Sequence, residues 1–386
     1  MISFVILTRN RPHALLRRVR DLCAWIARSN TAAELIVLDN ASFERPIIDN
    51  DTTLGVPFKH IALDQNFGQR ARLCVPTIAD AASDWFVMLD DDTTLATPRE
   101  TDLEAVLNEW SPHTGQQVGS RVGIVAADIY NRYQGAPPVR AGGGLPEVAR
   151  SASFAIRREA LLACDKLTPG LRGFAAELDL AANILRAGYS TVFDPRLITI
   201  RRVRDRRRDA QRVGRWLMDR LHVVHIYAPE HERVDAMRLM LRAALRRAGR
   251  WISEQDFEQW LRVLNTRLAT KKRSPLTQSQ WDRLIGVAAA REALLPHTTT
   301  GCTRFALIEE SDDTPLITRV VHELGATLVT HSDHPDALLL ATLEPGKLID
   351  AMFTQTHGRR EGSPPVIAPW MPPVPNAIEQ HTLRAA

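Results

Sequence analysis

The fold is decided by the stretch Asp84-Trp85-Phe86-Val87-Met88-Leu89-Asp90-Asp91-Asp92-Thr93-Thr94. Its five apolar residues are too few for a lone helix and predict a buried strand that ends in three consecutive carboxylates. Hard divalent cations such as Mg²⁺ or Mn²⁺ prefer oxygen ligands and often join one or two carboxylates to a substrate diphosphate. The three aspartates therefore predict a metal and diphosphate site, although a solvated acidic turn or a helix N-cap is equally consistent with them.

Predicted strands and helices alternate on both sides of this stretch. Apolar runs over 2–7, 34–38 and 58–63 are typical of buried strands, and a helix is expected to begin at Pro12. Another helix is expected over 71–82. Strand–helix–strand units of this length predict a parallel sheet with right-handed crossovers, so we expect residues 1–204 to form an α/β domain.

The second half of this domain has a less regular pattern. Residues 134–145 are rich in Gly and Pro and form either a loop that closes over a substrate or a plain connector. The elements expected around this loop are a strand at 122–127, a strand at 153–156, a helix from about 157, a helix over 174–185 capped by Gly188, and short strands at 189–193 and 197–200.

The pattern changes twice after residue 204. Helical periodicity dominates 205–296, which begins within the basic run Arg201–Arg208. Strand and helix patterns then alternate over 297–386, with strands expected near 305–308, 326–329, 336–340 and 365–367 and helices over 315–324 and 345–353. This small α/β unit has no glycine-rich phosphate loop, so a scaffolding or interface role is expected for it.

Composition sets limits on the class of protein. The chain has 386 residues, of which 45% are hydrophobic and 24% charged, with a net charge of +4, as in ordinary globular enzymes of two or three units. Its four cysteines lie far apart in apolar contexts, which suits buried free thiols in a reducing cytoplasm. The start of the chain is strand-like instead of a signal peptide, and no apolar run reaches bilayer length, so we expect a cytoplasmic protein with at most peripheral membrane contact.

Five motifs occur in a recognisable order over the first half of the chain. They are Phe4-Val5-Ile6-Leu7-Thr8-Arg9-Asn10-Arg11-Pro12, Leu35-Ile36-Val37-Leu38-Asp39-Asn40-Ala41-Ser42, Asn66-Phe67-Gly68, Leu89-Asp90-Asp91-Asp92, and Glu177-Leu178-Asp179-Leu180 followed by Gly188-Tyr189. Together they resemble the family 2 glycosyltransferases with the GT-A fold, a Rossmann-like nucleotide-diphospho-sugar transferase fold, over about residues 1–228. The resemblance implies a hexosyl- or pentosyltransferase that moves a sugar from a UDP-, dTDP- or GDP-sugar to an acceptor hydroxyl, with inversion.

The resemblance also implies where the donor binds. Thr8, Arg9 and Asn10 match the turn that borders the base, and Asp39 matches the acid that contacts base or ribose. A carboxylate can accept hydrogen bonds from the N–H and O–H groups of both. The other matching positions are Asn66 and Gly68, which close the nucleotide pocket; Arg70 or Arg72, which neutralises phosphate; and Asp90, Asp91 and Asp92, of which Asp92 and Asp90 match the ligands of Mn²⁺ or Mg²⁺.

The chain departs from the family pattern at two places. The family's catalytic acid matches Glu177, where an Asp is usual, so the general base is either Glu177 or Asp179. Both are also acids in the first turn of a helix, where a negative charge is stabilising in any case. Arg201, followed by Arg202, stands where many relatives place a metal-binding His. A guanidinium binds phosphate and not metal, so these arginines are expected to share in neutralising the diphosphate.

The acceptor is left open by the sequence. The basic run Arg201–Arg208 is either a solvated helix surface, a face for an anionic membrane that carries a lipid-linked acceptor, or a face for nucleic acid whose modified base receives the sugar. A glycan acceptor is also consistent. Two other classes compete with a transferase: a degenerate GT-A domain that only binds, and a nucleotidyltransferase, whose glycine-rich basic loop is absent here.

Overall fold

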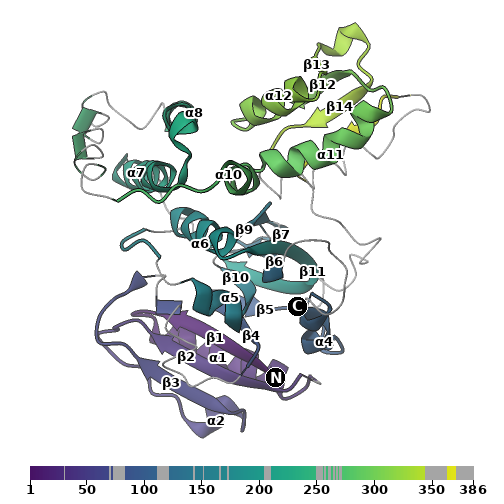
Figure 1. The fold of residues 1–386 in the computed structure, drawn as a ribbon. Helices are drawn as coiled ribbons and strands as arrows, with labels where there is room; N and C mark the ends of the chain where they lie inside the picture. The colour runs from purple at the N-terminus through teal and green to yellow at the C-terminus, as the bar shows by residue number, and fades with distance from the viewer. Residues whose placement is uncertain are drawn as a thin grey trace.

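The computed structural model describes residues 1–29, 31–68, 71–72, 83–110, 121–141, 144–150, 152–164, 167–171, 174–203, 210–248, 255, 258–259, 262–263, 266, 268, 272–343 and 363–370. A mixed sheet forms the N-terminal domain, the helices α7, α8 and α10 lie above it, and a small α/β unit follows (Figure 1). None of the described helices is both long and apolar enough to cross a bilayer.

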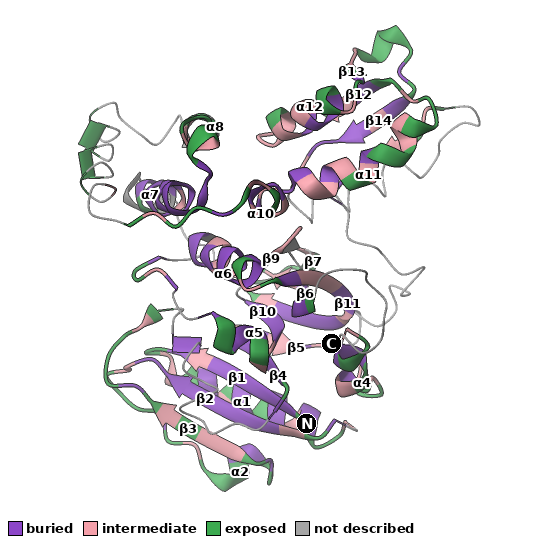
Figure 2. Cartoon of the chain, viewed as in Figure 1, coloured by how far each residue is buried: buried purple, intermediate pink, exposed green. Residues whose placement is uncertain are grey.

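Four parallel strands form one half of the N-terminal sheet. They are β3 (Phe58–Ala62), β2 (Ala33–Asp39), β1 (Ile2–Thr8) and β4 (Trp85–Asp90), in this spatial order. The apolar runs of β1, β2 and β4 are buried on both faces of the sheet, while the edge strand β3 is only partly buried (Figure 2). The strand predicted before the three aspartates is therefore confirmed as a central strand of the sheet.

The order of the sheet then continues through the antiparallel β10 (Ser153–Arg157), β6 (Arg121–Arg132), β11 (Tyr189–Arg202) and β5 (Thr93–Leu95). A short strand β7 (Val139–Arg140) pairs with β6, and β8 (Gly144–Leu145) pairs with β9 (Val148–Ala149). The sheet is thus mixed, and not parallel throughout as the alternating pattern predicted.

Helices cover both faces of this sheet. Alternate residues such as Phe4 and Ile6 pack with α1 (Pro12–Ile26), whereas Val5 and Met88 belong to the core that includes α5 (Arg158–Ala163). Two short helices, α2 (Asn50–Thr53) and α4 (Leu103–Glu109), were not predicted. Among the described cysteines, Cys23 and Cys164 are buried free thiols, as expected, whereas Cys302 is a free thiol that is only partly buried.

Two other predictions for this domain need correction. The strands expected at 189–193 and 197–200 are one strand, β11, whose register with β6 shifts between Asp194 and Ile198, where Pro195 lacks an N–H group for the ladder. The stretch 134–145 is not one loop, because β7 and β8 lie in it. The helix predicted over 71–82 lies mostly outside the described residues. The helix predicted over 345–353 and the basic stretch 204–208 lie outside them entirely.

The helical segment packs on α6 (Phe174–Arg186). Helices α7 (Ala210–Tyr227), α8 (Glu230–Ala248) and α10 (Gln278–Leu284) share a core with it. The last unit has four parallel strands in the order β13 (Thr327–Leu328), β12 (Arg304–Glu309), β14 (Ala337–Leu340) and β15 (Val366–Ile367), with α12 (Thr314–Glu323) and the 3₁₀ turn η3 (His331–Asp333).

Helix α11 (Val287–Thr299) crosses the boundary expected at residue 296. Its buried residues Val287, Ala290 and Leu294 pack in the core of the C-terminal sheet. Gly286, just before it, has a φ of +84°, a left-handed conformation that glycine adopts at little cost. We therefore propose that the C-terminal unit begins near Gly286.

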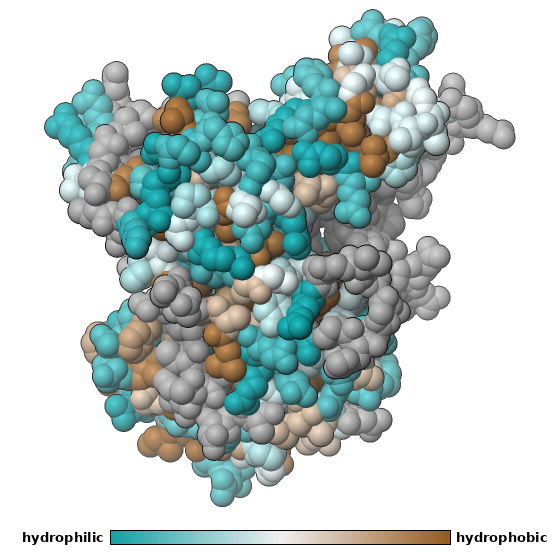
Figure 3. All heavy atoms as spheres, in the orientation of Figure 1, coloured by the Kyte–Doolittle hydropathy of each residue, from teal (hydrophilic) through white to brown (hydrophobic). Residues whose placement is uncertain are grey.

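On the face shown in Figure 3, hydrophobic residues lie in small groups among hydrophilic ones.

Candidate active site

The polar residues that follow strands β1, β2 and β4 lie at one edge of the sheet. Thr8 is paired in register with Asp39, and Leu7 is paired with Asp90, so the three strands end side by side. Thr8 and Asp39 are both buried at this edge. Ligands of open α/β sheets bind outside the carboxyl ends of the strands, so the predicted donor residues occupy the expected place.

Asp39 carries a buried acceptor that the protein does not use. Its side chain is 1% exposed, and its Oδ1 accepts a hydrogen bond of 2.9 Å from the N–H of Ser42. Its Oδ2 is buried without a hydrogen-bond partner among the described residues. A buried carboxylate oxygen without a partner costs free energy, so this atom is ready to accept from a donor on a ligand.

Asn10 joins the turn after β1 to the turn after β2. Its φ of +55° is in the left-handed region, which Asn tolerates better than most residues. Its N–H donates to Ser42 Oγ at 2.8 Å, and its Oδ1 accepts from the N–H of Phe43 at 2.9 Å. The predicted residue Asn10 thus shapes the turns beside Asp39, while Arg9 next to it is exposed.

Asn40 holds the segment that contains the predicted residues Asn66 and Gly68. Its amide donates to Asn66 Oδ1 at 3.0 Å and to the carbonyl of Gly68 at 3.2 Å, and it accepts from the N–H of Phe67 at 2.8 Å. Sequence reasoning did not assign a role to Asn40. Its place directly after Asp39 in the same motif was the available signal.

The middle aspartate, Asp91, is a buried anchor. It is 5% exposed, accepts from Thr8 Oγ1 at 3.0 Å and forms an ion pair of 2.7 Å with Arg11. Burial raises the pKa of Asp91 despite these partners. Burial would lower the pKa of Arg11, but the charge and hydrogen bond of Asp91, together with the charges of Asp92 and Asp90, outweigh burial and the pKa rises. Arg11 was predicted only as part of a helix start, so its role beside the aspartates was missed.

The two outer aspartates are also paired with arginines. Asp90 lies 2.5 Å from Arg72, whose guanidinium is 5.8 Å from the ring of Phe154. Asp92 lies 3.4 Å from Arg201 Nε and 3.6 Å from Arg11 Nη1. The antiparallel pairing of β5 with β11 explains the contact of Arg201, because Arg201 is paired with Thr93.

Asp92 has the most exposed carboxylate of the three aspartates. Its side chain is 24% exposed, and the hydrogen bond that it accepts from Thr93 is long, at 3.4 Å. The carboxylates of Asp92 and Asp90 fit the hard oxygen donors that Mn²⁺ and Mg²⁺ prefer. No group of three or more His, Cys, Asp or Glu side chains suited to a metal occurs among the described residues. A cation here would complete its coordination with substrate oxygens or water.

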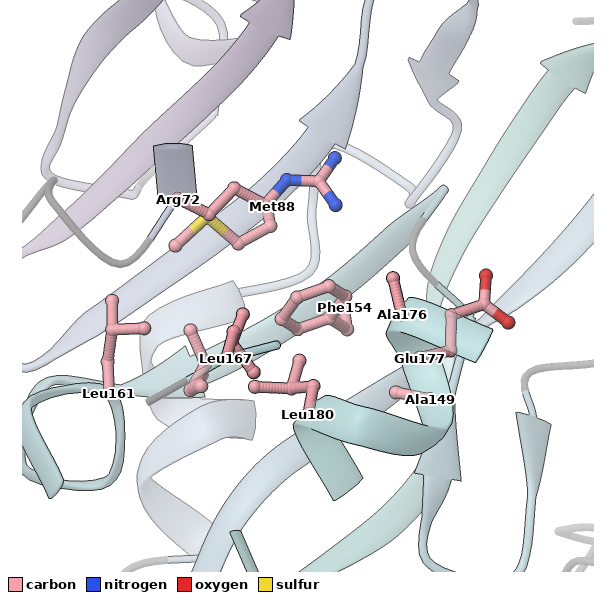
Figure 4. A pocket seen from close by; sticks show the side chains of 10 residues that line it. Arg72, Met88, Ala149, Phe154, Leu161, Leu167, Ala176, Glu177 and Leu180 are labelled. Carbon is pink, nitrogen blue, oxygen red and sulfur yellow. The ribbon is translucent and has the colours of Figure 1, made fainter. Parts of the chain in front are cut away.

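Glu177 and Arg72 line one pocket. The pocket lies between β4, β10 and the first turns of α6, and its empty space together with its open mouth is about 410 Å³. In Figure 4 the Glu177 carboxylate lies away from the group formed by Leu161, Leu167 and Leu180. Arg72 lines this pocket and pairs with Asp90, so the pocket lies between Glu177, the predicted general base, and the aspartates.

Asp179 lies on the same helix but is enclosed. It is 1% exposed and accepts from Thr168 N–H at 2.6 Å, Thr168 Oγ1 at 2.7 Å and Tyr227 Oη at 2.7 Å. Burial raises the pKa of Asp179, although these hydrogen bonds lower it in part. Both carboxylate oxygens are therefore occupied, and Asp179 ties α6 to α7 through Tyr227.

The remaining predicted residues contribute less to this geometry. Arg202 is exposed, and its N–H donates to the carbonyl of Asp92 at 2.8 Å. Arg70 lies outside the described residues.

Comparison with known proteins gives one family. Residues 3–157 match the family model described as glycosyl transferase family 2. The matched segment contains Asp39 and the three aspartates, whereas Glu177, Asp179 and Arg201 lie beyond it. None of the curated proteins matches the chain.

Two solved structures show a distant similarity to the chain. The crystal structure of GalNAc-T7 with UDP, GalNAc and Mn²⁺ is 14% identical, with a TM-score of 0.43, and covers 69% of this chain and 54% of that one. The structure of S. aureus TarS residues 1–349 in complex with UDP-GlcNAc is 12% identical, with a TM-score of 0.46, and covers 84% of this chain and 92% of that one. This chain thus spans about half the length of the GalNAc-T7 chain.

Proposed function

Because residues 3–157 match the family model of glycosyl transferase family 2, we propose that the chain transfers a sugar from a nucleotide-diphosphate sugar to an acceptor hydroxyl. The observation that carries the proposal is the sheet edge itself. The unused Oδ2 of buried Asp39 lies at the same edge as the three arginine-paired aspartates. A nucleoside supplies hydrogen-bond donors for Asp39 Oδ2, and a diphosphate interacts with the positively charged arginines beside the aspartates.

The base and ribose are assigned to the β1 and β2 ends. Asp39 Oδ2 accepts from an imide N–H or a ribose hydroxyl, and Thr8 and Asn10 fix the neighbouring turn. Asn66 and Gly68, held by Asn40, close the other side. UDP-, dTDP- and GDP-sugars are the donors to test.

The diphosphate is assigned to the aspartate end. Arg201 contacts Asp92 there, Arg72 contacts Asp90, and the exposed Arg202 follows Arg201 in the chain. Asp92, together with Asp90, would hold Mn²⁺ or Mg²⁺, which as a Lewis acid stabilises the departing nucleoside diphosphate. The protein's own task is to align the leaving group with the acceptor.

Glu177 is proposed as the general base. The acceptor oxygen attacks the anomeric carbon on the face opposite the diphosphate and passes its proton to the Glu177 carboxylate as the bond to the diphosphate breaks. One bond forms and one breaks at the same carbon, so the configuration inverts. Asp179 is unsuited to this role because both of its oxygens are occupied, and we propose that it positions α6.

Release of nucleotide from each of the three donor classes tests the proposal. Glu177→Gln should lower transfer by at least about a hundredfold, within the range of general-base catalysis, and should leave nucleotide binding intact. Glu159, an exposed acid on α5, provides the matched control, and Glu159→Gln should behave as wild type. Wild-type protein that binds nucleotide tightly but releases none from any donor would contradict transfer and favour a binding module.

A further inference from the structure

We propose that this chain binds its nucleoside diphosphate without requiring a divalent cation, because Arg11 and Arg201 supply the positive charge at Asp92. This inference rests on the proposed function, whose donor site it describes further. It states which charged side chains of the protein contact the diphosphate.

The balance of charge at the strand end is the first argument. Each of the three aspartates is matched by a guanidinium group, Arg72 at Asp90, Arg11 at Asp91 and Arg201 at Asp92. Arginine stays protonated at all ordinary pH values, so these charges are permanent. An acidic cluster that is already neutral attracts a cation with two positive charges much less than an unpaired cluster does, and it does not repel the diphosphate.

Arg201 is held at this place by the backbone. In the pairing of β11 with β5 it lies opposite Thr93, the residue after Asp92. The next residue, Arg202, donates its N–H to the carbonyl of Asp92 at 2.8 Å, which fixes the two segments together. The backbone of Arg201 is therefore fixed next to the segment that carries Asp92.

The guanidinium of Arg201 keeps capacity for a phosphate. Its side chain is 42% exposed, and its contact with Asp92, at 3.4 Å from Nε, is longer than an ordinary charge-assisted hydrogen bond. A guanidinium has five N–H donors, so a long contact through Nε leaves most of them for a bidentate interaction with phosphate oxygens.

Arg11 adds a second fixed charge on the other side of Asp92. It is the N-cap residue of α1, and its ion pair with buried Asp91 holds its guanidinium 3.6 Å from Asp92. The first N–H groups of α1 and the helix dipole add to the positive potential at this end of the sheet. Arg11 and Arg201 thus approach the two oxygens of Asp92 from different strand ends.

Calorimetric titration of UDP, dTDP and GDP into the whole chain tests the inference, with each titration made once with EDTA and once with Mn²⁺. The wild type should bind one nucleotide in both conditions, with affinities that differ less than about tenfold. Arg201→Gln should lose about tenfold or more in EDTA, the value of a charge-assisted hydrogen bond, and should regain part of it in Mn²⁺. Arg201→His, which offers a metal ligand in place of the charge, should bind only with Mn²⁺.

A matched control separates local from general charge effects. Arg99 is an exposed arginine that follows β5, and Arg99→Gln should bind as the wild type in both conditions. Wild-type binding that appears only with Mn²⁺ would overturn the inference and leave the proposed function intact, as would equal binding by Arg201→Gln and wild type in EDTA. No binding of any nucleotide in either condition would overturn both.

Discussion

Replacing Asp179 with Asn separates the structural role of this residue from the catalytic alternative. The Asp179 carboxylate accepts three hydrogen bonds, two from Thr168 and one from Tyr227. An amide keeps one acceptor oxygen and places an NH₂ group against one of these donors. A lost or unsatisfied buried hydrogen bond costs about 1–3 kcal/mol, so we expect Asp179→Asn to lower the free energy of unfolding by about 2–4 kcal/mol.

The pH dependence of this effect follows from the raised pKa of Asp179. A carboxyl group with a higher pKa in the folded than in the unfolded state binds more protons when folded. Its contribution to stability is therefore complete below its unfolded pKa and is lost as the pH rises through the folded value. The advantage of wild type over Asp179→Asn should be largest in acid, below the unfolded pKa, and should shrink as the pH rises through the folded pKa.

Urea unfolding followed by circular dichroism, at several pH values, measures both quantities. Tyr227→Phe is the companion variant, because it removes one of the three donors and should cost about 1–2 kcal/mol. A stable Asp179→Asn protein that binds nucleotide but transfers no sugar would refute this reasoning and assign the general base to Asp179 instead of Glu177.

Three further substitutions test packing and loop geometry. Gly123→Ala places a Cβ 2.7 Å from that of Tyr189 and should cost about 1–3 kcal/mol in scanning calorimetry, so an unchanged melting temperature would contradict the close packing of β6 and β11. Asn40→Ala removes the bonds that hold segment 66–68 and should weaken nucleotide binding about tenfold in calorimetric titration, and unchanged affinity would exclude that segment from the site. Gly286→Ala forces a left-handed φ on alanine and should destabilise the protein by about 1–2 kcal/mol in urea unfolding, and equal stability would speak against the left-handed conformation at residue 286.

The central strands could be predicted because their signal is local. A run such as Trp85–Leu89 is buried on both faces, so it has no polar alternation and cannot belong to a surface element. The same rule missed β5, because Thr93–Leu95 is too short to show a period, and it divided β11 into two strands, because Pro195 interrupts the run. Their pairing depends on residues about a hundred positions apart, which no local pattern records.

The site residues that lie at the ends of strands could be predicted from the sequence. Asp39 and the three aspartates follow apolar runs directly, so their place at one sheet edge followed from parallel pairing. The partners of these acids were not predictable. Arg11 has the sequence context of a helix start and reaches Asp91 only because β1 and β4 are neighbours. The enclosure of Asp179 likewise depends on Tyr227, at the end of α7, and no local pattern shows that α7 packs against α6.

A thermal-shift screen of wild type and Asp39→Ala against UDP, dTDP, GDP and CMP, with and without Mn²⁺, tests the donor site most directly. A ligand at a hundred times its dissociation constant adds about 2.7 kcal/mol to stability, which is several degrees for a chain of this size. We predict that one nucleotide raises the melting temperature of the wild type and of the control Asp51→Ala, whose exposed acid lies in α2, and fails to raise that of Asp39→Ala. No shift with any nucleotide, or an equal shift in Asp39→Ala, would contradict a nucleotide site at this edge of the sheet.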